Sequence, residues 1–216
     1  MRQADSAAPL SGKLLAGAAD LVQLLAQGEL AVHPTESLYG IAAHPLRDAA
    51  LDRLDRLKGR SLHRGYVLVV GSLAGAQGWV QLDAATRLLL ERAWPGPLSV
   101  VCRGGALLPA RLGRADGSVA LRVDRHPASV AIGALLGSPW VSTSLNFAGQ
   151  PPARTLAEVP AELAALLAGA WDTPPLPHGL ASTLVQVQAG KVAILREGAV
   201  ARSLLQEALD TAGLGG

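Results

Sequence analysis

The sequence predicts a single α/β domain built on a mixed β-sheet. Segments with leucine at helical spacing alternate with short β-branched runs over most of the 216 residues, and such alternation is typical of α/β domains. The alternation is irregular and ends in a hairpin-like pair of segments, so we expect antiparallel as well as parallel strand pairs. Half of the residues are apolar and 17% are charged. This composition provides a sizeable core and excludes a disordered chain.

The first helix and strand are expected near the N-terminus. Residues 14–27 carry leucine at helical spacing, and Gly28 suits the end of a helix. Residues 29–33 then form a short apolar strand. Pro34 ends this strand, because proline lacks the N–H that a β-ladder needs, and it opens a polar loop over residues 34–40.

A second helix, a buried strand and a third helix follow. Asp48 can cap a helix that has leucine on one side and charged residues on the other, and Gly59 ends it. Residues 66–70 are apolar and β-branched, which is the pattern of a strand buried on both faces. Residues 83–93 form the third helix, which ends at residues 94–97 because the two prolines there cannot remain helical.

The next part of the chain alternates again. Strands are expected at residues 98–102 and 119–123, and proline at the first position indicates a helix over residues 127–136. Residues 140–143 form another strand, and residues 155–168 another helix.

The C-terminal part consists of a loop, a hairpin and a tail. Residues 172–181 are rich in proline and glycine, which indicates a loop. Two strands at residues 183–187 and 192–195 flank Gly190 as a hairpin, and a last helix begins near Ser203. The expected organisation is a flexible lead-in at 1–12, one domain at 13–200, and a C-terminal helix and tail at 201–216.

Charge and missing motifs exclude several classes of protein. The formal net charge is +2, which permits an anionic ligand but does not require one. The sequence has no GxxxxGK[ST] phosphate loop, no GxGxxG after a strand and no GxSxG elbow. The five histidines lack metal-ligand spacing, and the single cysteine, Cys102, is expected to be a buried structural thiol. No apolar stretch reaches ~18 residues and no secretory signal is present, so we expect a soluble, cytoplasmic protein without a membrane partner.

The candidate functional residues are polar clusters at the ends of expected strands. The clusters are residues 34–40, residues 58–60, Arg122, residues 142–146, residues 182–183 and Arg196.

Each cluster also has an ordinary structural interpretation. Lys58 and Arg60 could be cations that favour the C-terminal end of a helix. Arg122 stands in an apolar strand, where it either points to solvent or points inward and needs an anionic partner. Ser144 and Asn146 could be turn residues.

Three further polar residues are given structural interpretations. Glu36 could be a general base, but a solvated loop carboxylate is the preferred interpretation. His63 and His126 are interpreted as surface or capping side chains. Thr35 and Ser182 carry no signal by themselves.

In their order along the chain, the clusters resemble the YrdC-like family, and within it the short bacterial TsaC-type threonylcarbamoyl-AMP synthases. The resemblance spans roughly residues 14–199, and the pairing of KxR with SxN is its hallmark. The matching segments are HPTESLYGIA, KGRSLHRGYVLVV, WPGPLSVV, VALRVDRHP, VSTSLNFAGQPPARTLAEV, STLVQV and AILREGA.

The resemblance implies a fold and an activity. The fold would be a single YrdC-like domain with a twisted mixed sheet, flanking helices and a large basic concave groove. The activity would be that of a nucleotidyltransferase that forms threonylcarbamoyl-AMP and pyrophosphate from L-threonine, bicarbonate or CO₂, and ATP. The product serves threonylcarbamoyladenosine modification of tRNAs that read ANN codons.

The resemblance also implies cofactors and partners. No tightly bound cofactor is expected; Mg²⁺ would accompany ATP as substrate, and no dedicated metal site is visible. The extra C-terminal domain of longer members is absent from this sequence, so separate tRNA-modification proteins would transfer the threonylcarbamoyl group. Weak binding of tRNA or double-stranded RNA is a further expectation.

Residue roles are implied by position in the matching segments. Lys58 and Arg60 would be catalytic and would hold the triphosphate, and Arg122 would clamp the threonine carboxylate. The implied ATP-binding residues are Lys58, Arg60, Ser118, Ser144, Asn146, Pro152 and Arg196. The implied threonine-binding residues are Thr35, Arg122, Ser142 and Ser182.

The sequence departs from the family pattern and leaves two alternatives. Leu145 stands where alanine is usual, which could reshape the adenine site, and His33 stands where an aromatic residue is usual. One alternative is a non-enzymatic module that binds structured RNA, which would show salt-sensitive binding and no ATP turnover. The other is a paralogue with another carbamoyl acceptor.

Overall fold

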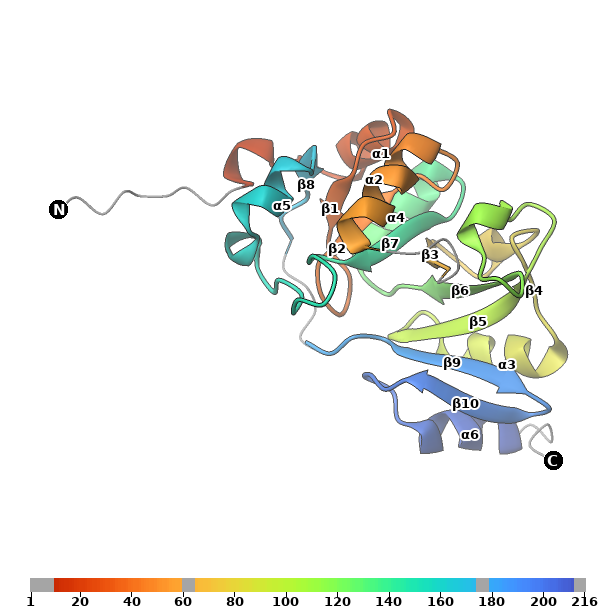
Figure 1. Cartoon of the computed structure of the whole chain (residues 1–216). Coiled ribbons are helices and arrows are strands. Elements are labelled where there is room, and N and C mark those ends of the chain that lie inside the picture. Colours follow the sequence, from red (N-terminus) through yellow and green to blue (C-terminus); the bar gives the residue numbers. More distant parts are fainter. Residues whose placement is uncertain (1–9, 60–64, 174–178, 212–216) are drawn as a thin grey trace.

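The structure is a computed structural model that describes residues 10–59, 65–173 and 179–211. Its centre is a ten-stranded mixed sheet in the order β10-β9-β5-β6-β3-β7-β2-β1-β8, with β4 paired to β5 (Figure 1). The pairs β3/β6, β5/β9 and β1/β8 are parallel and the others are antiparallel. The strands are β1 (Ala31–His33), β2 (Gly40–Ala43), β3 (Val67–Val70), β4 (Val80–Gln81), β5 (Leu98–Gly104), β6 (Ser118–Val123), β7 (Trp140–Ser144), β8 (Gly169–Ala170), β9 (Thr183–Gln188) and β10 (Lys191–Arg196). The predicted α/β class with a mixed sheet is confirmed.

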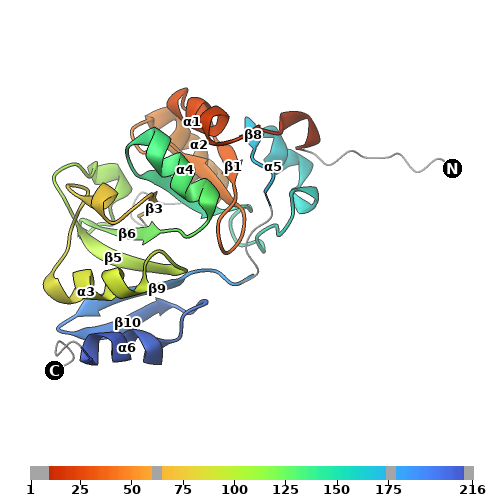
Figure 2. The ribbon, with the colours of Figure 1, turned by 180° about the vertical axis from the view of Figure 1, so that it is seen from behind.

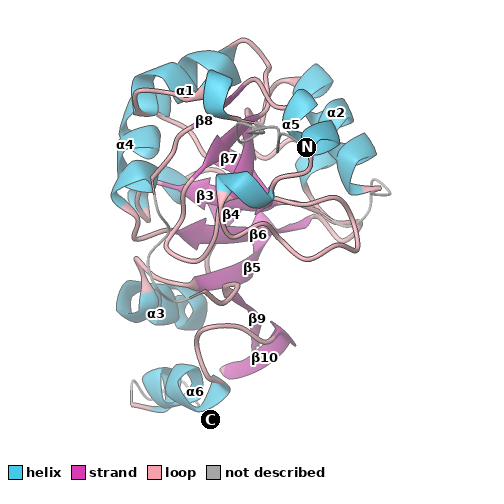
Figure 3. Ribbon diagram, turned by 90° about the vertical axis from the view of Figure 1, so that its left-hand side faces the viewer, coloured by secondary structure: helices cyan, strands magenta, loops and turns pink. Residues whose placement is uncertain are grey.

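Helices cover both faces of the sheet. Figure 3 shows α1 and α4 on one side of the strands and α2 on the other, and Figure 2 shows α1 and α4 from the side opposite to Figure 1. The α-helices are α1 (Ala18–Ala26), α2 (Asp48–Lys58), α3 (Ala84–Ala93), α4 (Pro127–Leu136), α5 (Ala161–Ala165) and α6 (Arg202–Asp210). The 3₁₀ turns are Ser11–Lys13, Ala74–Ala76, Ala110–Leu112 and Leu156–Glu158.

Two apolar clusters fill the space between helices and sheet. The smaller cluster joins α1 and α4 to the face that carries Val69 and Trp140, which we call the α1/α4 face. The larger cluster joins α2, α3 and α6 to side chains of the opposite face, such as Leu68 and Leu121. Adjacent residues of one strand therefore serve different cores. Cys102 belongs to the larger cluster, as predicted, and burial raises the pKa of its thiol to about 12.

Two predicted helices differ from the structure for identifiable reasons. The first helix begins at Ala18 rather than at residue 14, because Gly17 precedes it and Leu14 pairs with Ala170 beside β8. The predicted helix at 155–168 is a 3₁₀ turn and the short helix α5, because Pro160 lacks an N–H and stands between them.

Three strands were not predicted at all. They are β2, β4 and β8, which are only two to four residues long and have no alternation of apolar and polar residues. Tertiary pairing defines these strands, not their own pattern.

Several expectations fall partly outside the described residues. They concern the lead-in at 1–9, Arg60 and His63, part of the loop at 172–181, and the end of the tail. Within the described part of the chain, no helix is long and apolar enough to span a bilayer, and no group of three His, Cys, Asp or Glu side chains gathers as a metal site would require.

Candidate functional site

Strand registers place most predicted site residues on one face of the sheet. Val67 of β3 lies opposite Ala120 of β6 and opposite Ser142 of β7. Side chains alternate between faces along a strand, so Arg122 and Ser144, each two residues from these positions, share that face. It is the α1/α4 face.

The same face continues into the C-terminal hairpin. Val101 of β5 lies opposite both Ala120 and Gln186 of β9. Ser182 lies four residues before Gln186, and Leu184, halfway between them, pairs with Arg196 of β10. Segments far apart in the sequence thus present polar side chains on one surface.

A cavity of about 200 Å³ opens on this surface. Val67 and Val69 supply part of its apolar wall, and its polar side chains come from the 34–40 loop, from β6, β7 and β10, and from Ser182 just before β9. The predicted residues that line it are Thr35, Arg122, Ser142, Ser144, Ser182 and Arg196. All of the residues implied to bind threonine therefore meet in one cavity.

Arg122 is held from one side by two buried carboxylates. Its Nη2 lies 2.8 Å from Glu36 Oε1 and 2.5 Å from Asp124 Oδ2, and it donates to Ser37 Oγ at 3.3 Å. Both carboxylates are fully buried. The interpretation of Glu36 as a solvated loop carboxylate is wrong, because the loop folds inward to meet the arginine. The alternative of a solvent-facing Arg122 is likewise excluded.

The guanidinium of Arg122 retains an unused donor. Its Nε is buried and has no hydrogen-bond partner among the described residues. A buried donor without an acceptor costs about 1–3 kcal/mol. Arg122 itself lines the cavity, so a carboxylate ligand there would meet its guanidinium.

Arg196 brings a second cation to the cavity. Its Nη2 donates to the carbonyl oxygen of Ser182 at 2.9 Å and to Ser182 Oγ at 3.0 Å, and Ser182 Oγ lies 3.0 Å from Ser99 Oγ. Burial and the nearby positive charge of Arg122 lower the pKa of Arg196. The two arginines therefore disfavour each other, and an anion between them would remove that repulsion.

Lys58 reaches the turn that follows β7. Its Nζ donates to the carbonyl oxygens of Ser144 and Asn146 and to Asn146 Oδ1, each at 2.6 Å. Gly59 ends α2 in the left-handed conformation. Asn146 Oδ1 also accepts a hydrogen bond from Ser144 Oγ at 2.6 Å. The KxR and SxN motifs are thus in direct contact through Lys58, whereas Arg60 lies outside the described residues.

Leu145 is a core residue that also lines a second cavity, beside Asn146 and Pro152. The side chain between Ser144 and Asn146 is fully buried and belongs to the larger core. The backbone N–H of Ala153 donates to the Leu145 carbonyl at 2.9 Å, which ties the turn to the following loop. Leu145 therefore anchors the turn in the core, while Ser144 is exposed and Asn146 is half-buried.

The remaining predicted residues lie around this turn or apart from it. Pro152 lines a second cavity of about 400 Å³ together with Asn146. Ser118, at the start of β6, donates to Asp116 Oδ1 at 2.6 Å and belongs to the lining of neither cavity. It shares the sheet face of Arg122 but is not brought into contact with the other site residues.

Sequence reasoning missed several polar residues of the site. Ser37, which lines the cavity beside the predicted Thr35, donates its backbone N–H to Thr35 Oγ1 at 3.1 Å. Tyr39 lines the cavity and donates to Asp172 at 3.3 Å; burial, then this carboxylate, raises the pKa of Tyr39 to about 12. Of the missed residues, only Asp124 had a signal, since it stands two positions after Arg122.

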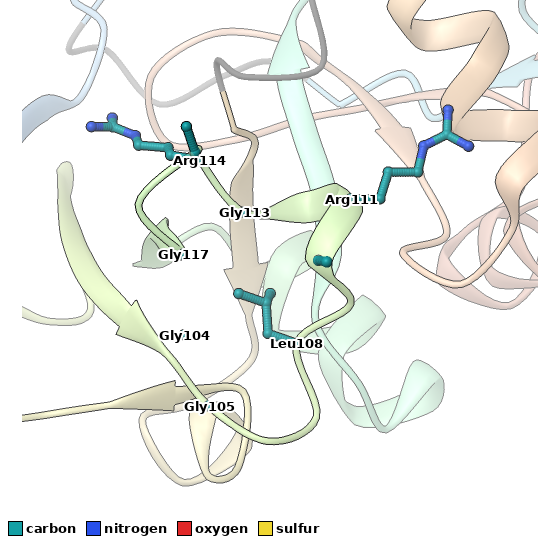
Figure 4. A pocket seen from close by; sticks show the side chains of 9 residues that line it. Gly104, Gly105, Leu108, Arg111, Gly113, Arg114 and Gly117 are labelled. Atoms are coloured by element: carbon teal, nitrogen blue, oxygen red, sulfur yellow. The ribbon is translucent and has the colours of Figure 1, made fainter.

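A larger cavity of about 530 Å³ lies elsewhere, beside the connection between β5 and β6. Its lining is mostly glycine, alanine and leucine, and Figure 4 shows the side chains of Arg111 and Arg114 extending away from it. None of the predicted site residues lines this cavity. Chemistry rather than size therefore identifies the smaller cavity as the candidate site.

Comparison with known sequences gives a family and named relatives. The family model described as Telomere recombination, of Sua5, YciO and YrdC, matches residues 23–198. The threonylcarbamoyl-AMP synthase of Chromohalobacter salexigens is 38% identical over 178 residues, which cover 80% of this chain and 94% of that protein. The threonylcarbamoyl-AMP synthase of Nitrosococcus oceani is 37% identical over 139 residues, or 63% of this chain and 75% of that protein.

Solved structures give the same fold. P. abyssi Sua5 in complex with L-threonine superposes with a TM-score of 0.80 at 22% identity over 88% of this chain, which spans 56% of the Sua5 chain. E. coli YciO superposes with a TM-score of 0.76 at 21% identity, covering 84% of this chain and 88% of that chain.

Proposed function

Since this chain belongs to the Sua5/YciO/YrdC family, we propose that it is a threonylcarbamoyl-AMP synthase. The enzyme forms threonylcarbamoyl-AMP and pyrophosphate from L-threonine, bicarbonate or CO₂, and ATP. Curated relatives with this name are 34–38% identical to it over most of the chain.

One observation carries the assignment of the threonine end of the site. Arg122 lines the cavity, and Glu36 and Asp124 fix its guanidinium through Nη2. A planar guanidinium that is already oriented binds a carboxylate with little further loss of entropy. We assign the α-carboxylate of threonine to this group. Thr35, Ser142 and Ser182 then surround the rest of the amino acid. Val67 and Val69 face its methyl group.

Arg196 lies where the second negative charge would form. The amine of threonine adds to CO₂ to give a carbamate, and a carbamate oxygen attacks the α-phosphorus of ATP and displaces pyrophosphate. The carbamate adds a charge next to the α-carboxylate, so two cations for two anions suit this intermediate. Orientation of the bound reactants supplies much of the rate acceleration.

The nucleotide would occupy the side of the site beyond Ser144. Lys58 and Asn146 would contact the phosphates and the nucleoside, with Pro152 in the adjoining cavity. Arg60 and Ser118 are proposed ATP-binding residues on the family pattern alone. Mg²⁺ would enter bound to ATP, since electrostatic stabilisation of the phosphates is the main demand of this chemistry. The product would pass to tRNA-modification proteins in the cytoplasm, and weak tRNA or double-stranded RNA binding remains part of the proposal.

The test is pyrophosphate release from ATP, with threonine and bicarbonate each omitted in turn. Dependence on both, together with formation of threonylcarbamoyl-AMP, supports the assignment. Salt-sensitive RNA binding without turnover would replace it with the RNA-binding module. Turnover with a different amine would replace it with the paralogue.

A matched pair of lysine variants locates the chemistry. We expect Lys58→Ala to lower kcat/KM by a factor of about 10²–10³, because its charge acts on the developing phosphate charge and its hydrogen bonds hold the Ser144–Asn146 turn. Lys191→Ala, at an exposed position that begins β10, is the control. Equal activity of both variants would contradict the role of Lys58.

A further inference from the structure

His33 is a buried histidine that contacts the cavity through another residue. It ends β1 on the α1/α4 face and is fully buried. Its Nε2 lies 2.8 Å from Ser142 Oγ, and Ser142 lines the cavity. The imidazole itself is not part of the lining. Any influence of His33 on a ligand therefore passes through the Ser142 hydroxyl.

The surrounding chain is built to let these two side chains meet. A Cβ atom at Gly40 would lie 2.7 Å from His33 Nε2 and 2.9 Å from Ser142 Oγ, closer than real Cβ contacts. Only glycine leaves room for the pair at this position of β2. Trp140 stands edge-on to the imidazole, with ring centroids 6.1 Å apart at 83°. Backbone and aromatic packing thus fix both the position and the orientation of the ring.

The direction of the His33–Ser142 hydrogen bond depends on which ring nitrogen carries the proton. Burial lowers the pKa of the ring, and the interaction of His33 with the Pro34 backbone opposes this larger effect. In the tautomer protonated on Nδ1, Nε2 faces the Ser142 hydroxyl as an acceptor. Nε2 then accepts the hydroxyl proton of Ser142. The lone pairs of Ser142 Oγ are left to face the cavity.

The low pKa of the His33 ring is compatible with a positioning role but not with a role as general base. Burial lowers the pKa of His33 to about 4, against the opposing influence of Asp124. A group with this pKa is neutral at physiological pH and is too weak a base to hold a proton taken from an amine. The ring can orient a hydroxyl but cannot serve as the proton acceptor of the reaction.

We infer that His33 is a positioning residue that fixes the Ser142 hydroxyl as an acceptor for the amine end of the substrate amino acid. This inference rests on the proposed function for the identity of that amino acid. An acceptor at this point recognises an N–H donor, which both the free amine and its carbamate provide. Arg122 holds the carboxylate, and the His33–Ser142 pair sets the angle at which the amine is presented to CO₂.

The test compares variants of His33 in threonine binding and in turnover. His33→Phe keeps a ring and removes both nitrogens, whereas His33→Gln returns an amide near the position of Nε2. We expect His33→Phe to weaken threonine binding about five- to tenfold, the usual effect of one lost hydrogen bond, and to leave ATP affinity within about twofold. Partial recovery of threonine affinity in His33→Gln is the second expectation. His44→Gln is the matched control, because His44 accepts a hydrogen bond from the Leu46 N–H outside the cavity lining.

A double variant tests whether His33 acts through Ser142. If it does, His33→Phe combined with Ser142→Ala binds threonine no more weakly than Ser142→Ala alone. If the losses of threonine affinity in the two single variants multiply in the double variant, the inference is overturned. Unchanged threonine affinity in a folded His33→Phe would also overturn it, as would an equal loss of threonine and ATP affinity in that variant.

Threonine binding by calorimetry and threonylcarbamoyl-AMP formation are measured separately. A wild-type protein that binds threonine but makes no product would refute the proposed function, and the binding data would still decide the role of His33. A wild-type protein that does not bind threonine would overturn the inference.

Discussion

Two arginine clusters in this molecule share the same chemistry and differ in burial. Arg122 meets Glu36 and Asp124 where all of the side chains are at most 8% exposed. Arg111 meets three aspartates on α2, and the aspartate side chains are 85%, 53% and 18% exposed. Both clusters join distant segments through one guanidinium.

The difference shows what burial adds to an ion pair. At Arg111, hydrogen bonds with Asp52 and Asp55 outweigh the desolvation of the guanidinium and raise its pKa, but water screens the attraction. At Arg122 the carboxylates cannot be resolvated if the arginine is lost, so the cluster is strongly interdependent. Among the described residues, Nε lacks a partner in both arginines, but Arg122 lines the cavity that the predicted threonine-binding residues share, whereas Arg111 lines a cavity without them.

Removal of the buried arginine should have the largest effect on stability. Arg122→Met keeps a side chain of similar length but leaves two carboxylates buried without their cation. We expect the free energy of unfolding to fall by about 3–5 kcal/mol, and threonine binding to be lost. Urea denaturation at pH 7 measures the first effect and calorimetry the second.

Arg122→Lys separates the two effects of that substitution. A lysine retains the charge that the carboxylates need, but not the planar fork that binds a ligand carboxylate. Stability should therefore be largely retained while threonine affinity falls more than tenfold. Wild-type threonine affinity in Arg122→Lys would show that the cluster is purely structural.

The next prediction extends the comparison of buried and exposed groups to two histidines. His33 is fully buried near Asp124, Arg122 and His126, and burial lowers its pKa to about 4. His44 is half-buried, and burial together with the nearby Arg47 also lowers its pKa. A folded-state pKa below the unfolded value of 6.5 means that the unfolded chain binds more protons between these values. The contribution of His33 to the free energy of unfolding should therefore be fully present above pH 6.5 and should fall by about 3 kcal/mol as the pH is lowered to 4.

Urea denaturation at several pH values between 7 and 4 measures this slope. His33→Gln removes the titrating group and should flatten the curve, whereas His44→Gln should leave most of the slope in place. An unchanged slope in His33→Gln would show that other groups carry the acid sensitivity.

The sequence predicted the regular elements of the fold better than the irregular ones. The α4 helix was predicted with both of its ends, because Pro127 and Gly137 mark them. The strand β2 was missed, because its four residues show no periodicity and are defined by pairing with β1 and β7. Such contacts are non-local, and a local pattern cannot contain them.

The sequence predicted the residues that line the site but not the side chains that hold them in position. The family pattern pointed to Arg122, and the structure adds that two carboxylates hold it. Glu36 looked like a solvated loop residue because its partner is 86 positions away in sequence. In the sequence, His33 is only a departure from the aromatic residue that is usual in the family, and its contact with Ser142 spans 109 positions. Residues that orient a site through long-range contacts leave no local signal.

The smallest effect is expected at the exposed arginine. Arg111→Met removes one cation from three aspartates that are mostly solvated, so the free energy of unfolding should fall by about 1 kcal/mol. The loss should diminish in 1 M salt, because the wild-type attraction is itself screened there. Threonine affinity should not change, since none of these residues lines the cavity of Arg122. A loss as large as that of Arg122→Met, measured by the same urea denaturation, would show that exposure does not distinguish the two clusters.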